Sequence, residues 1–300
     1  MIINNILTTC ANCGKGEESA GDLKACTACK LVKYCNRDCQ IAHRPQHKKA
    51  CKKRAAELHD EKLFKQPLPN EDCPICMLRI PSLHTGSKYR ACCGKTICSG
   101  CIHAVQKRDG VGLCPFCRTP GPTTDKESNE QYKKRMEVDD AEAMHGLGCD
   151  YSTGAHGLPQ DYAKALGLWH RAAKLGCAQS HYDIGCAYYV GNGVERDEKK
   201  TVHYMELAAM GGHVKARHNL GSFDGRAGNK SRAVKHYMIA VGFGCTDSLG
   251  MIKKMFTNGY ATKEDYTKAL QAYQSYLDEI KSPQRDEAAA FDERYKYYEE

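Results

Sequence analysis

The sequence contains no apolar run approaching the ~18 residues that a helix needs to cross a membrane, so we expect no membrane partner. Residues 1–7 are too short for a secretory signal peptide and lack its basic flank and cleavage pattern. We therefore predict an intracellular protein, cytoplasmic or nuclear, in a reducing compartment. Disulfides are rare in such compartments, so metal binding is the expected role of most of the 19 cysteines.

Cysteine is also scarce in the second part of the chain. Fifteen of the 19 cysteines precede residue 118, and only four follow it. The charge balance changes at about the same place. Residues 1–122 carry 20 Lys and Arg against 10 Asp and Glu, whereas residues 123–300 carry 24 against 26. Two kinds of structure are therefore joined in one chain of 300 residues, a length that allows one to three domains.

Two proline-containing segments divide the chain. Pro67 and Pro69 separate a first cysteine cluster from a second, and Pro120 and Pro122 separate the second cluster from the remainder. A charged helix is expected just before the first of these segments. The predicted organisation is a zinc finger at 1–55, a helical linker at 56–69, a second zinc finger at 70–120, a linker at 121–134, a helical array at 135–281 and a C-terminal capping helix at 282–300.

The first cluster offers eight metal-binding side chains, enough for two closed tetrahedral zinc sites. A Cys-x2-Cys turn directs two sulfurs at one point, and two residues four apart share one helix face. The four pairs are Cys10/Cys13, Cys26/Cys29, Cys35/Cys39 and His47/Cys51. His43 also lies four residues from Cys39 and from His47, but we predict a surface helix histidine there.

These pairs, with the dipeptides Tyr34-Cys35 and His47-Lys48, resemble the MYND family of zinc fingers over about 42 residues. In that family a groove docks a short proline-containing peptide, and a tryptophan usually lines it. Arg44 stands in place of that tryptophan, so the alternative is a purely structural finger. The resemblance implies that ligands alternate between two zinc ions, with Cys10, Cys13, Cys35 and Cys39 on one ion and Cys26, Cys29, His47 and Cys51 on the other.

The second cluster begins with Cys73-Pro74-Ile75-Cys76 and ends with Cys114-Pro115-Phe116-Cys117-Arg118. Eight cysteines in this order resemble a RING domain over about 46 residues. The resemblance implies one zinc site from ligands one, two, five and six, and a second site from the others. The first site would be Cys73, Cys76, Cys98 and Cys101.

The middle of the second cluster departs from the common RING pattern. Lys95 stands where a histidine ligand is usual, and a protonated lysine has no lone pair to give to a metal. Cys92 is therefore predicted to complete an all-cysteine second site, and His84 and His103 are poorer candidates. The second site would be Cys92, Cys93, Cys114 and Cys117.

The RING resemblance also implies a ubiquitin ligase, which holds a ubiquitin-charged conjugating enzyme in a reactive orientation and forms no covalent intermediate. Active RINGs carry an apolar residue in the first Cys-x2-Cys and a proline in the last, and often a basic residue after it. Ile75, Pro115 and Arg118 meet these requirements. Arg118 would bridge ubiquitin and the conjugating enzyme through its guanidinium group. Inert RINGs share the last motif, so a zinc scaffold without activity is the alternative.

The remainder of the chain repeats itself every 36–37 residues. Leu147-Gly148-x2-Tyr151 recurs as Ile184-Gly185-x2-Tyr188, and Asp161 recurs as Asp197. Weaker units follow near Leu220 and near Tyr260. A period of this length with two helical patterns predicts an α-solenoid.

Several residue types in these repeats have predictable roles. Asp161 and Asp197 are placed to cap helices, and Gly176 and Gly212 to end them in a left-handed turn. Gly148 lacks a side chain where two helices are expected to cross closely. The segment beginning at 282 is predicted to be a terminal cap on the stack.

This part resembles Sel-1-like repeats, relatives of tetratricopeptide repeats, and the resemblance implies an adaptor surface for partner proteins. The predicted fold class is multidomain, with two small cross-braced zinc modules followed by an all-α helical-repeat solenoid. Four Zn2+ ions are expected, because 16 ligands fill four tetrahedral sites. The chain has no room for the catalytic domain of the lysine methyltransferases that carry MYND fingers.

Three classes of function are compatible with this sequence. The first is a RING-type ubiquitin ligase whose repeats and MYND finger bind the substrate. The second is a non-enzymatic, zinc-dependent adaptor or scaffold. Nucleic-acid binding is the least favoured, because the positive charge is scattered among the zinc ligands and is not arrayed on one recognition helix.

Overall fold

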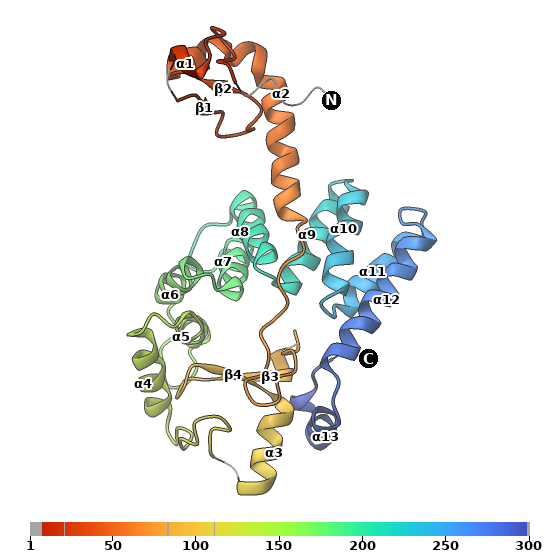
Figure 1. Cartoon of the computed structure of the whole chain (residues 1–300). Helices are drawn as coiled ribbons and strands as arrows, with labels where there is room; N and C mark the ends of the chain where they lie inside the picture. Colours follow the sequence, from red (N-terminus) through yellow and green to blue (C-terminus); the bar gives the residue numbers. More distant parts are fainter. Residues whose placement is uncertain (1–7, 21, 83, 111, 299–300) are drawn as a thin grey trace. The chain divides into compact units, whose positions relative to one another are not determined.

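The computed structural model describes residues 8–20, 22–82, 84–110 and 112–298 (Figure 1). Residues 1–7, on which the signal-peptide expectation rests, lie outside these ranges. The chain divides into two compact units, residues 1–65 and residues 66–300. Within the described ranges, no helix has the length and apolar character needed to cross a membrane.

The first unit combines short elements with one long helix: α1 (Glu17–Ala20), β1 (Lys24–Ala25), β2 (Lys33–Tyr34) and α2 (Arg37–Leu63). Asn36 begins α2, because its side chain accepts a hydrogen bond from the backbone N–H of Cys39. The buried core is small and consists mostly of candidate ligands. Its members are Cys10, Leu23, Cys26, Cys29 and Tyr34. Such a core is too small to hold the unit together unless a metal contributes folding free energy. We call residues 10–51 the first cysteine module.

The second unit begins with the second cysteine module, residues 73–118. It contains η1 (His84–Gly86), β3 (Ser87–Arg90), β4 (Lys95–Cys98) and α3 (Ser99–Asp109). Strands β3 and β4 form an antiparallel hairpin with Ser87 opposite Cys98. Ile80, Ile97 and Ile102 pack with the cysteines and give this module more apolar core than the first.

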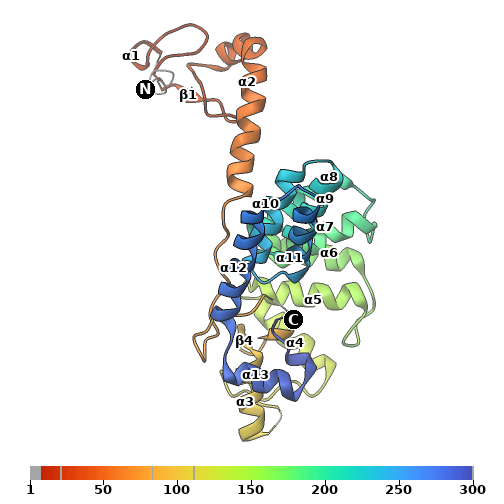
Figure 2. The same cartoon turned by 90° about the vertical axis from the view of Figure 1, so that its right-hand side faces the viewer.

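A stack of helix pairs follows the second cysteine module (Figures 1 and 2). Each pair packs on the next, as predicted for a helical-repeat solenoid. The pairs are α5 (Ala141–Thr153) with α6 (Tyr162–Lys174), α7 (Ala178–Val190) with α8 (Glu198–Met210), α9 (Val214–Arg226) with α10 (Lys230–Val241), and α11 (Thr246–Thr257) with α12 (Lys263–Ile280).

The residues predicted to begin and end the helices of the repeats do so in the structure. Asp161 and Asp197 cap α6 and α8, because each carboxylate accepts a backbone N–H three residues later. Gly176 and Gly212 follow α6 and α8 with φ of +94° and +92°, a conformation that an L side chain rarely adopts. The caps and turns that the sequence predicted for the first two pairs are confirmed.

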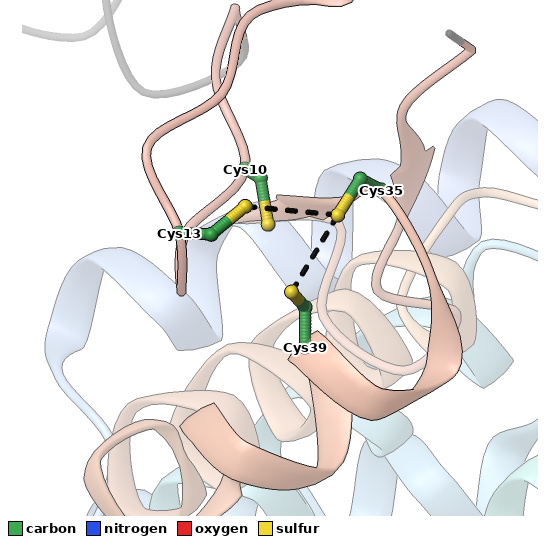
Figure 3. A group of neighbouring side chains, drawn as sticks. All are labelled: Cys10, Cys13, Cys35 and Cys39. Atoms are coloured by element: carbon green, nitrogen blue, oxygen red, sulfur yellow. Dashed lines mark hydrogen bonds between the residues drawn. The ribbon is translucent and has the colours of Figure 1, made fainter. Parts of the chain in front are cut away.

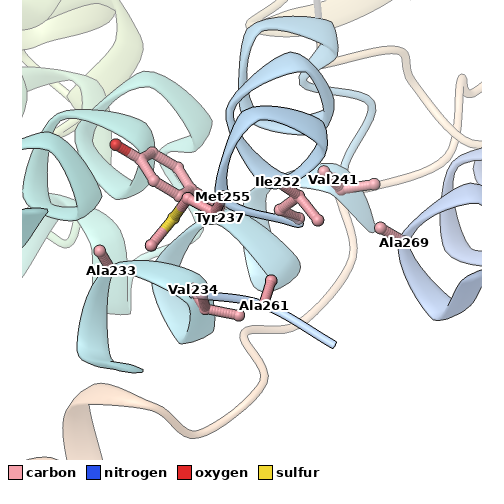
Figure 4. Close-up of a cluster of buried hydrophobic side chains, with 8 residues drawn as sticks. All are labelled: Ala233, Val234, Tyr237, Val241, Ile252, Met255, Ala261 and Ala269. Carbon is pink, nitrogen blue, oxygen red and sulfur yellow. The ribbon is translucent and has the colours of Figure 1, made fainter. Parts of the chain in front are cut away.

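The repeat array is held by packing between successive pairs. Figure 4 shows one core cluster, in which Tyr237 and Val241 of α10 pack with Ile252 and Met255 of α11. The predicted close crossing at Gly148 is present. A Cβ atom built there would lie 2.6 Å from Nε1 of Trp169, so only glycine fits without movement of the indole.

Two segments differ from the sequence-based expectation. The predicted linker 121–134 largely forms a helix, α4 (Asp125–Met136), which packs against α5. Thr124 caps it, and the Glu127 carboxylate accepts hydrogen bonds from the backbone N–H and the hydroxyl of Thr123. The pattern Thr-x-x-Glu was a capping signal that the proline-rich surroundings obscured.

The second difference is at the C-terminus. Ser282 caps α13 (Pro283–Phe291), and Pro283 begins it. However, α13 does not lie on the end of the helix stack. It packs against α3 of the second cysteine module (Figure 1) and is followed by η2 (Glu293–Tyr295). The prediction of a terminal cap on the stack is therefore wrong, because the buried side chains of α13 face the cysteine module.

Candidate metal centres

Within the two cysteine modules, the structure brings together four sets of metal-binding side chains. In each set the four donor atoms lie within 4.8 Å of one another. Residues far apart in sequence meet in every set, as Figure 3 shows for one of them. The sets are Cys10, Cys13, Cys35 and Cys39; Cys26, Cys29, His47 and Cys51; Cys73, Cys76, Cys98 and Cys101; and Cys92, Cys93, Cys114 and Cys117. These are the groupings predicted from the sequence.

The distances between sulfur atoms fit a tetrahedral zinc ion. With Zn–S bonds of ~2.3 Å, ligand sulfurs lie about 3.8 Å apart. The Sγ–Sγ distances are 3.7 Å for Cys13 and Cys35, 3.8 Å for Cys26 and Cys51, and 3.7 Å for Cys76 and Cys98. In the fourth set, Cys93 and Cys114 are 3.8 Å apart. Thiolate and imidazole donors at these separations fit Zn2+ better than a hard cation such as Mg2+.

A common backbone turn positions four of the five Cys-x2-Cys pairs, and the fifth, Cys98 with Cys101, lies at the start of α3. The residue after the second cysteine has a positive φ: +74° at Gly14, +59° at Lys30, +55° at Met77 and +64° at Arg118. In each turn its N–H donates to the carbonyl of the first cysteine, over 2.9–3.0 Å. Non-glycine residues adopt this conformation only at a steric cost. Its recurrence in all four turns indicates that bringing two sulfurs together outweighs that cost.

The adjacent cysteines Cys92 and Cys93 reach the same set through a different turn. The N–H groups of Cys93 and Gly94 both donate to the carbonyl of Arg90, and Gly94 has a φ of +69°. The backbone therefore bends sharply at the end of β3. The Sγ atoms of Cys92 and Cys117 lie 3.4 Å apart as a result.

Within the first cysteine module, the thiols have divergent acidities. Burial opposes ionisation of Cys10 and Cys26, but hydrogen bonds from backbone N–H groups lower the pKa of each thiol to about 6. The hydrogen bond with Cys39 raises the pKa of Cys35 to about 12, and burial raises that of Cys51 to about 12. Several thiolates cannot share such a space without a cation, so metal binding releases protons from these clusters.

The alternative histidine ligands stand apart from the four sets. His43 Nδ1 lies 3.1 Å from the hydroxyl of Tyr34, so this histidine supports the core beside His47. It is half-buried and is not the surface histidine that the sequence predicted. His103 is buried against Phe291, with ring centroids 4.7 Å apart. The side chain of His84 lies outside the described part of the structure.

The residues predicted to contact a conjugating enzyme lie on the turns of the second cysteine module. Ile75 is 41% exposed, Pro115 is half-buried and Arg118 is exposed. Arg118 forms an ion pair with Asp109 at 2.7 Å, and Arg108 and Arg118 together lower the pKa of that carboxyl group. Two more exposed apolar side chains lie beside these cysteines, Met77 and Phe116, and neither was predicted from the sequence. Their place next to ligand cysteines was the available signal.

A groove of about 620 Å³ lies on the first cysteine module, between α2 and the turn of Cys26. Tyr34 and Ala28 contribute to its lining, together with the exposed Ile41. Four cationic side chains of α2 also line it, and no carboxylate does so among the described residues. The cations are Arg37, Arg44, Lys48 and Lys52.

Comparison with known proteins supports part of this assignment. Residues 10–51 match the MYND finger family, and residues 141–177 and 178–213 match the Sel1 repeat family. The chain is 34% identical over 105 residues to the chitin synthase regulator SKT5 of Saccharomyces cerevisiae, which covers 34% of this chain and 15% of that protein. It is 32% identical over 83 residues to the E3 ubiquitin-protein ligase GW2 of Oryza sativa subsp. indica, covering 23% of this chain and 18% of that protein.

The chain therefore spans less than a fifth of the length of these two relatives. Among solved structures, a Sel1 repeat protein from Oxalobacter formigenes is 22% identical, with a TM-score of 0.44 over 65% of this chain and 72% of that one. The family matches leave the second cysteine module unassigned. They show that residues 10–51 are a MYND finger and that residues 141–213 are two Sel1 repeats, at the front of a helical-repeat array.

Proposed function

We propose that the protein is a zinc-dependent ubiquitin ligase. A MYND finger joined to Sel1 repeats fits a protein-interaction adaptor. The second cysteine module adds the surface that a RING ligase requires. In this proposal it binds a ubiquitin-charged conjugating enzyme, while the repeats and the MYND finger hold the protein substrate. Four Zn2+ ions, one for each donor set, maintain the two modules.

The exposed apolar surface of the second module carries the proposal. Ile75, Met77 and Phe116 are 41%, 69% and 45% exposed, although residues of these types are usually buried. All three belong to turns that are fixed by ligand cysteines, so their positions are set by the metal sites. A rigid apolar surface of this kind suits the recognition of a second protein.

Arg118 adjoins this surface and is available for a further contact. Its partner is Asp109, in a solvent-exposed ion pair that contributes little to stability and can exchange partners. A guanidinium group can donate several hydrogen bonds at once, so it could hold ubiquitin against the conjugating enzyme. The rate gain would come from restricting the orientation of the thioester, because no side chain of the module takes part in bond formation.

The basic groove of the MYND finger is the second part of the proposal. Arg44, Lys48 and Lys52 follow one another by four residues, so they share one face of α2. Like charges at this spacing destabilise a helix by ~0.2–0.5 kcal/mol per pair. An acidic segment of a substrate would relieve that repulsion. Base stacking is not available in the groove, because the aromatic rings that line it, Tyr34 and His47, are 3% and 9% exposed.

Discharge of ubiquitin from a panel of charged conjugating enzymes tests the ligase proposal. The full chain should accelerate discharge, and Ile75→Ala and Arg118→Ala should each reduce the gain at least about tenfold, the loss expected for an anchor residue at an interface. Ile41→Ala is the matched control, because Ile41 is an exposed isoleucine of the other module, at 57% against 41% for Ile75.

The alternative is a non-enzymatic adaptor, which the likeness to a chitin synthase regulator favours. Under this alternative no conjugating enzyme is discharged faster by a sample that holds its zinc. Equal activity of the wild type and Ile75→Ala would also reject the proposed contact surface.

A further inference from the structure

The last part of the chain lies against the second cysteine module. We call residues 276–298 the C-terminal segment. It comprises the end of α12, all of α13 and η2, and it packs on α3 (Figures 1 and 2). The Tyr295 hydroxyl donates to the side chain of Gln106 at 2.8 Å, and Tyr276 accepts from the backbone N–H of Ser82 at 2.9 Å. The contacts therefore reach both the helix and the first turn of the module.

The approach between the two helices is close. A Cβ atom at Gly100 of α3 would lie 3.0 Å from both Cγ and the backbone nitrogen of Arg285 in α13. The Oε1 atom of Gln284 lies 3.8 Å from Sγ of Cys101, a predicted zinc ligand. Helix α13 therefore reaches the first metal site of this module directly.

Arg285 is the centre of this contact. It is 0% exposed, and its guanidinium nitrogens donate to the carbonyls of Arg79 at 2.8 Å, Ile280 at 2.7 Å and Leu78 at 3.2 Å. The same group lies 3.8 Å from Sγ of Cys76. Three of these four acceptors belong to residues 76–79, which complete the turn that carries Ile75.

A buried guanidinium group requires a compensating negative charge. Among the described residues, no carboxylate forms a hydrogen bond or ion pair with Arg285 in this structure. The negative charge beside it comes from cysteine sulfur. A Zn2+ ion with four thiolate ligands carries a net charge of about −2. The site of Cys73, Cys76, Cys98 and Cys101 is therefore suited to balance this arginine when it holds zinc.

We propose that the C-terminal segment is an integral part of this zinc site, with Arg285 as the residue that balances the thiolate charge and positions the turn of residues 73–79. Zinc retention and docking of α13 are then coupled, although some 200 residues separate them in the chain. The proposal assumes zinc in the site. The added consequence, that Arg285 orients Ile75 toward a conjugating enzyme, rests on the proposed ligase function.

The experiment measures zinc release from the full chain into a chromogenic chelator. Removing an outer hydrogen-bond partner of a metal ligand typically lowers metal affinity ~10–100-fold. Arg285→Met should therefore release about one zinc equivalent at least tenfold faster than the wild type. Arg285→Lys keeps the charge but cannot reach all four acceptors, so it should restore part of the retention.

Arg217→Met is the matched control. Arg217 is also deeply buried, at 2% exposed, and donates to the carbonyl of Ala209, within the repeats and outside both cysteine modules. It should lower thermal stability without changing zinc release. Unchanged release in Arg285→Met, or equally faster release in Arg217→Met, would overturn the proposal.

Two further measurements keep the outcome interpretable. If Arg285→Met does not fold, Gly100→Ala keeps the arginine but pushes its backbone and Cγ away from α3, and it should accelerate release of the same zinc ion. The Co2+-substituted chain should show an altered sulfur-to-metal absorption band in Arg285→Met and not in Arg217→Met. Neither zinc release nor this band involves ubiquitin, so a failure of the ligase proposal leaves both results decisive.

Discussion

The two cysteine modules use the same means of holding a metal and differ in what surrounds it. Each presents eight donors in two interleaved sets, and in each module two Cys-x2-Cys turns are followed by a residue at positive φ. The first module lies in a compact unit of its own, residues 1–65, and its core is mostly cysteine. The second has three isoleucines in its core and is completed by α13. Metal-binding side chains can therefore be gathered within one local stretch of sequence, or in a module that also packs against a distant helix.

Metal removal should give the largest effect on stability, and it should distinguish the two modules because only the second packs against α13. Structural zinc contributes ~10 kcal/mol or more to small zinc-dependent folds, so chelation should unfold both modules. Hydrogen exchange should then show lost protection at 10–51 and 73–117. Protection should also fall at 283–298, because α13 rests on α3.

In the same experiment the helices α5 to α10 should keep their protection, since packing and not metal holds them. Unchanged exchange at 283–298 after chelation would mean that α13 docks independently of the metal. Loss of protection throughout the repeats would contradict the view that metal stabilises the cysteine modules and that packing stabilises the repeats.

Two glycines of the helical repeats, Gly148 and Gly185, test how far side-chain packing stabilises this part of the chain. Gly148→Ala places a Cβ 2.6 Å from the Trp169 ring, and overpacking of this kind costs ~1–3 kcal/mol. At Gly185 the new Cβ would meet the flexible end of Met205 at 3.2 Å, and a helical alanine gains ~1 kcal/mol over glycine. Thermal melts should therefore fall for Gly148→Ala and hold or rise for Gly185→Ala, with zinc content unchanged in both.

Peptide binding at the basic groove of the first cysteine module should depend on salt, unlike binding at the apolar surface of the second. A labelled peptide of alternating Glu and Pro should bind the full chain in fluorescence anisotropy, more weakly as salt rises. Arg44→Glu should weaken binding about tenfold. Arg54→Glu is the control, because Arg54 lies on α2, pairs with Glu57 and Glu61 and does not line the groove. Equal binding by Arg44→Glu, or a preference for a single-stranded oligonucleotide, would reject the acidic-peptide proposal.

The smallest predicted effect lies in the repeats and depends on pH. Burial opposes the charge on His145, but its hydrogen bond to Asp183, at 2.8 Å, raises its pKa well above the ordinary value. Because the folded pKa is the raised one, the pair stabilises the fold below about pH 6.5, the unfolded pKa of histidine. The contribution fades as pH rises through the folded pKa.

The melting temperature of the wild type should therefore exceed that of Asp183→Asn most at pH 6 and less at pH 9. A difference that stays constant across this range would show that His145 does not change charge on unfolding. Zinc content should be equal in the two proteins, since neither residue touches a cysteine module.

Most of the candidate metal ligands could be predicted from the sequence, because the spacing that brings them together in pairs is local. Cys26 and Cys29 must share a turn, and His47 and Cys51 must share a helix face, whatever the rest of the chain does. Which ligand pairs share one zinc ion within each module came from family resemblance, since spacing alone permits other combinations of pairs. The helix caps at Asp161 and Asp197 were predictable for the same local reason.

Other features were not accessible in this way. The helix α4 was missed because Pro120 and Pro122 indicated a linker, although its capping residues lay just beyond them. Met77 and Phe116 were missed because exposure is a property of the folded module. No sequence pattern marks Arg285, since a buried arginine and a surface arginine look alike in sequence.

The sequence by itself determined which side chains form the candidate metal sites and where the repeats begin and turn, because those choices depend on neighbours within a few residues. Only the tertiary structure decided that α13 completes the second cysteine module. Arg285 donates to Arg79 across 206 positions in the chain. A contact of that range is set by the summed packing of the intervening repeats, which bring the C-terminus back to the metal site.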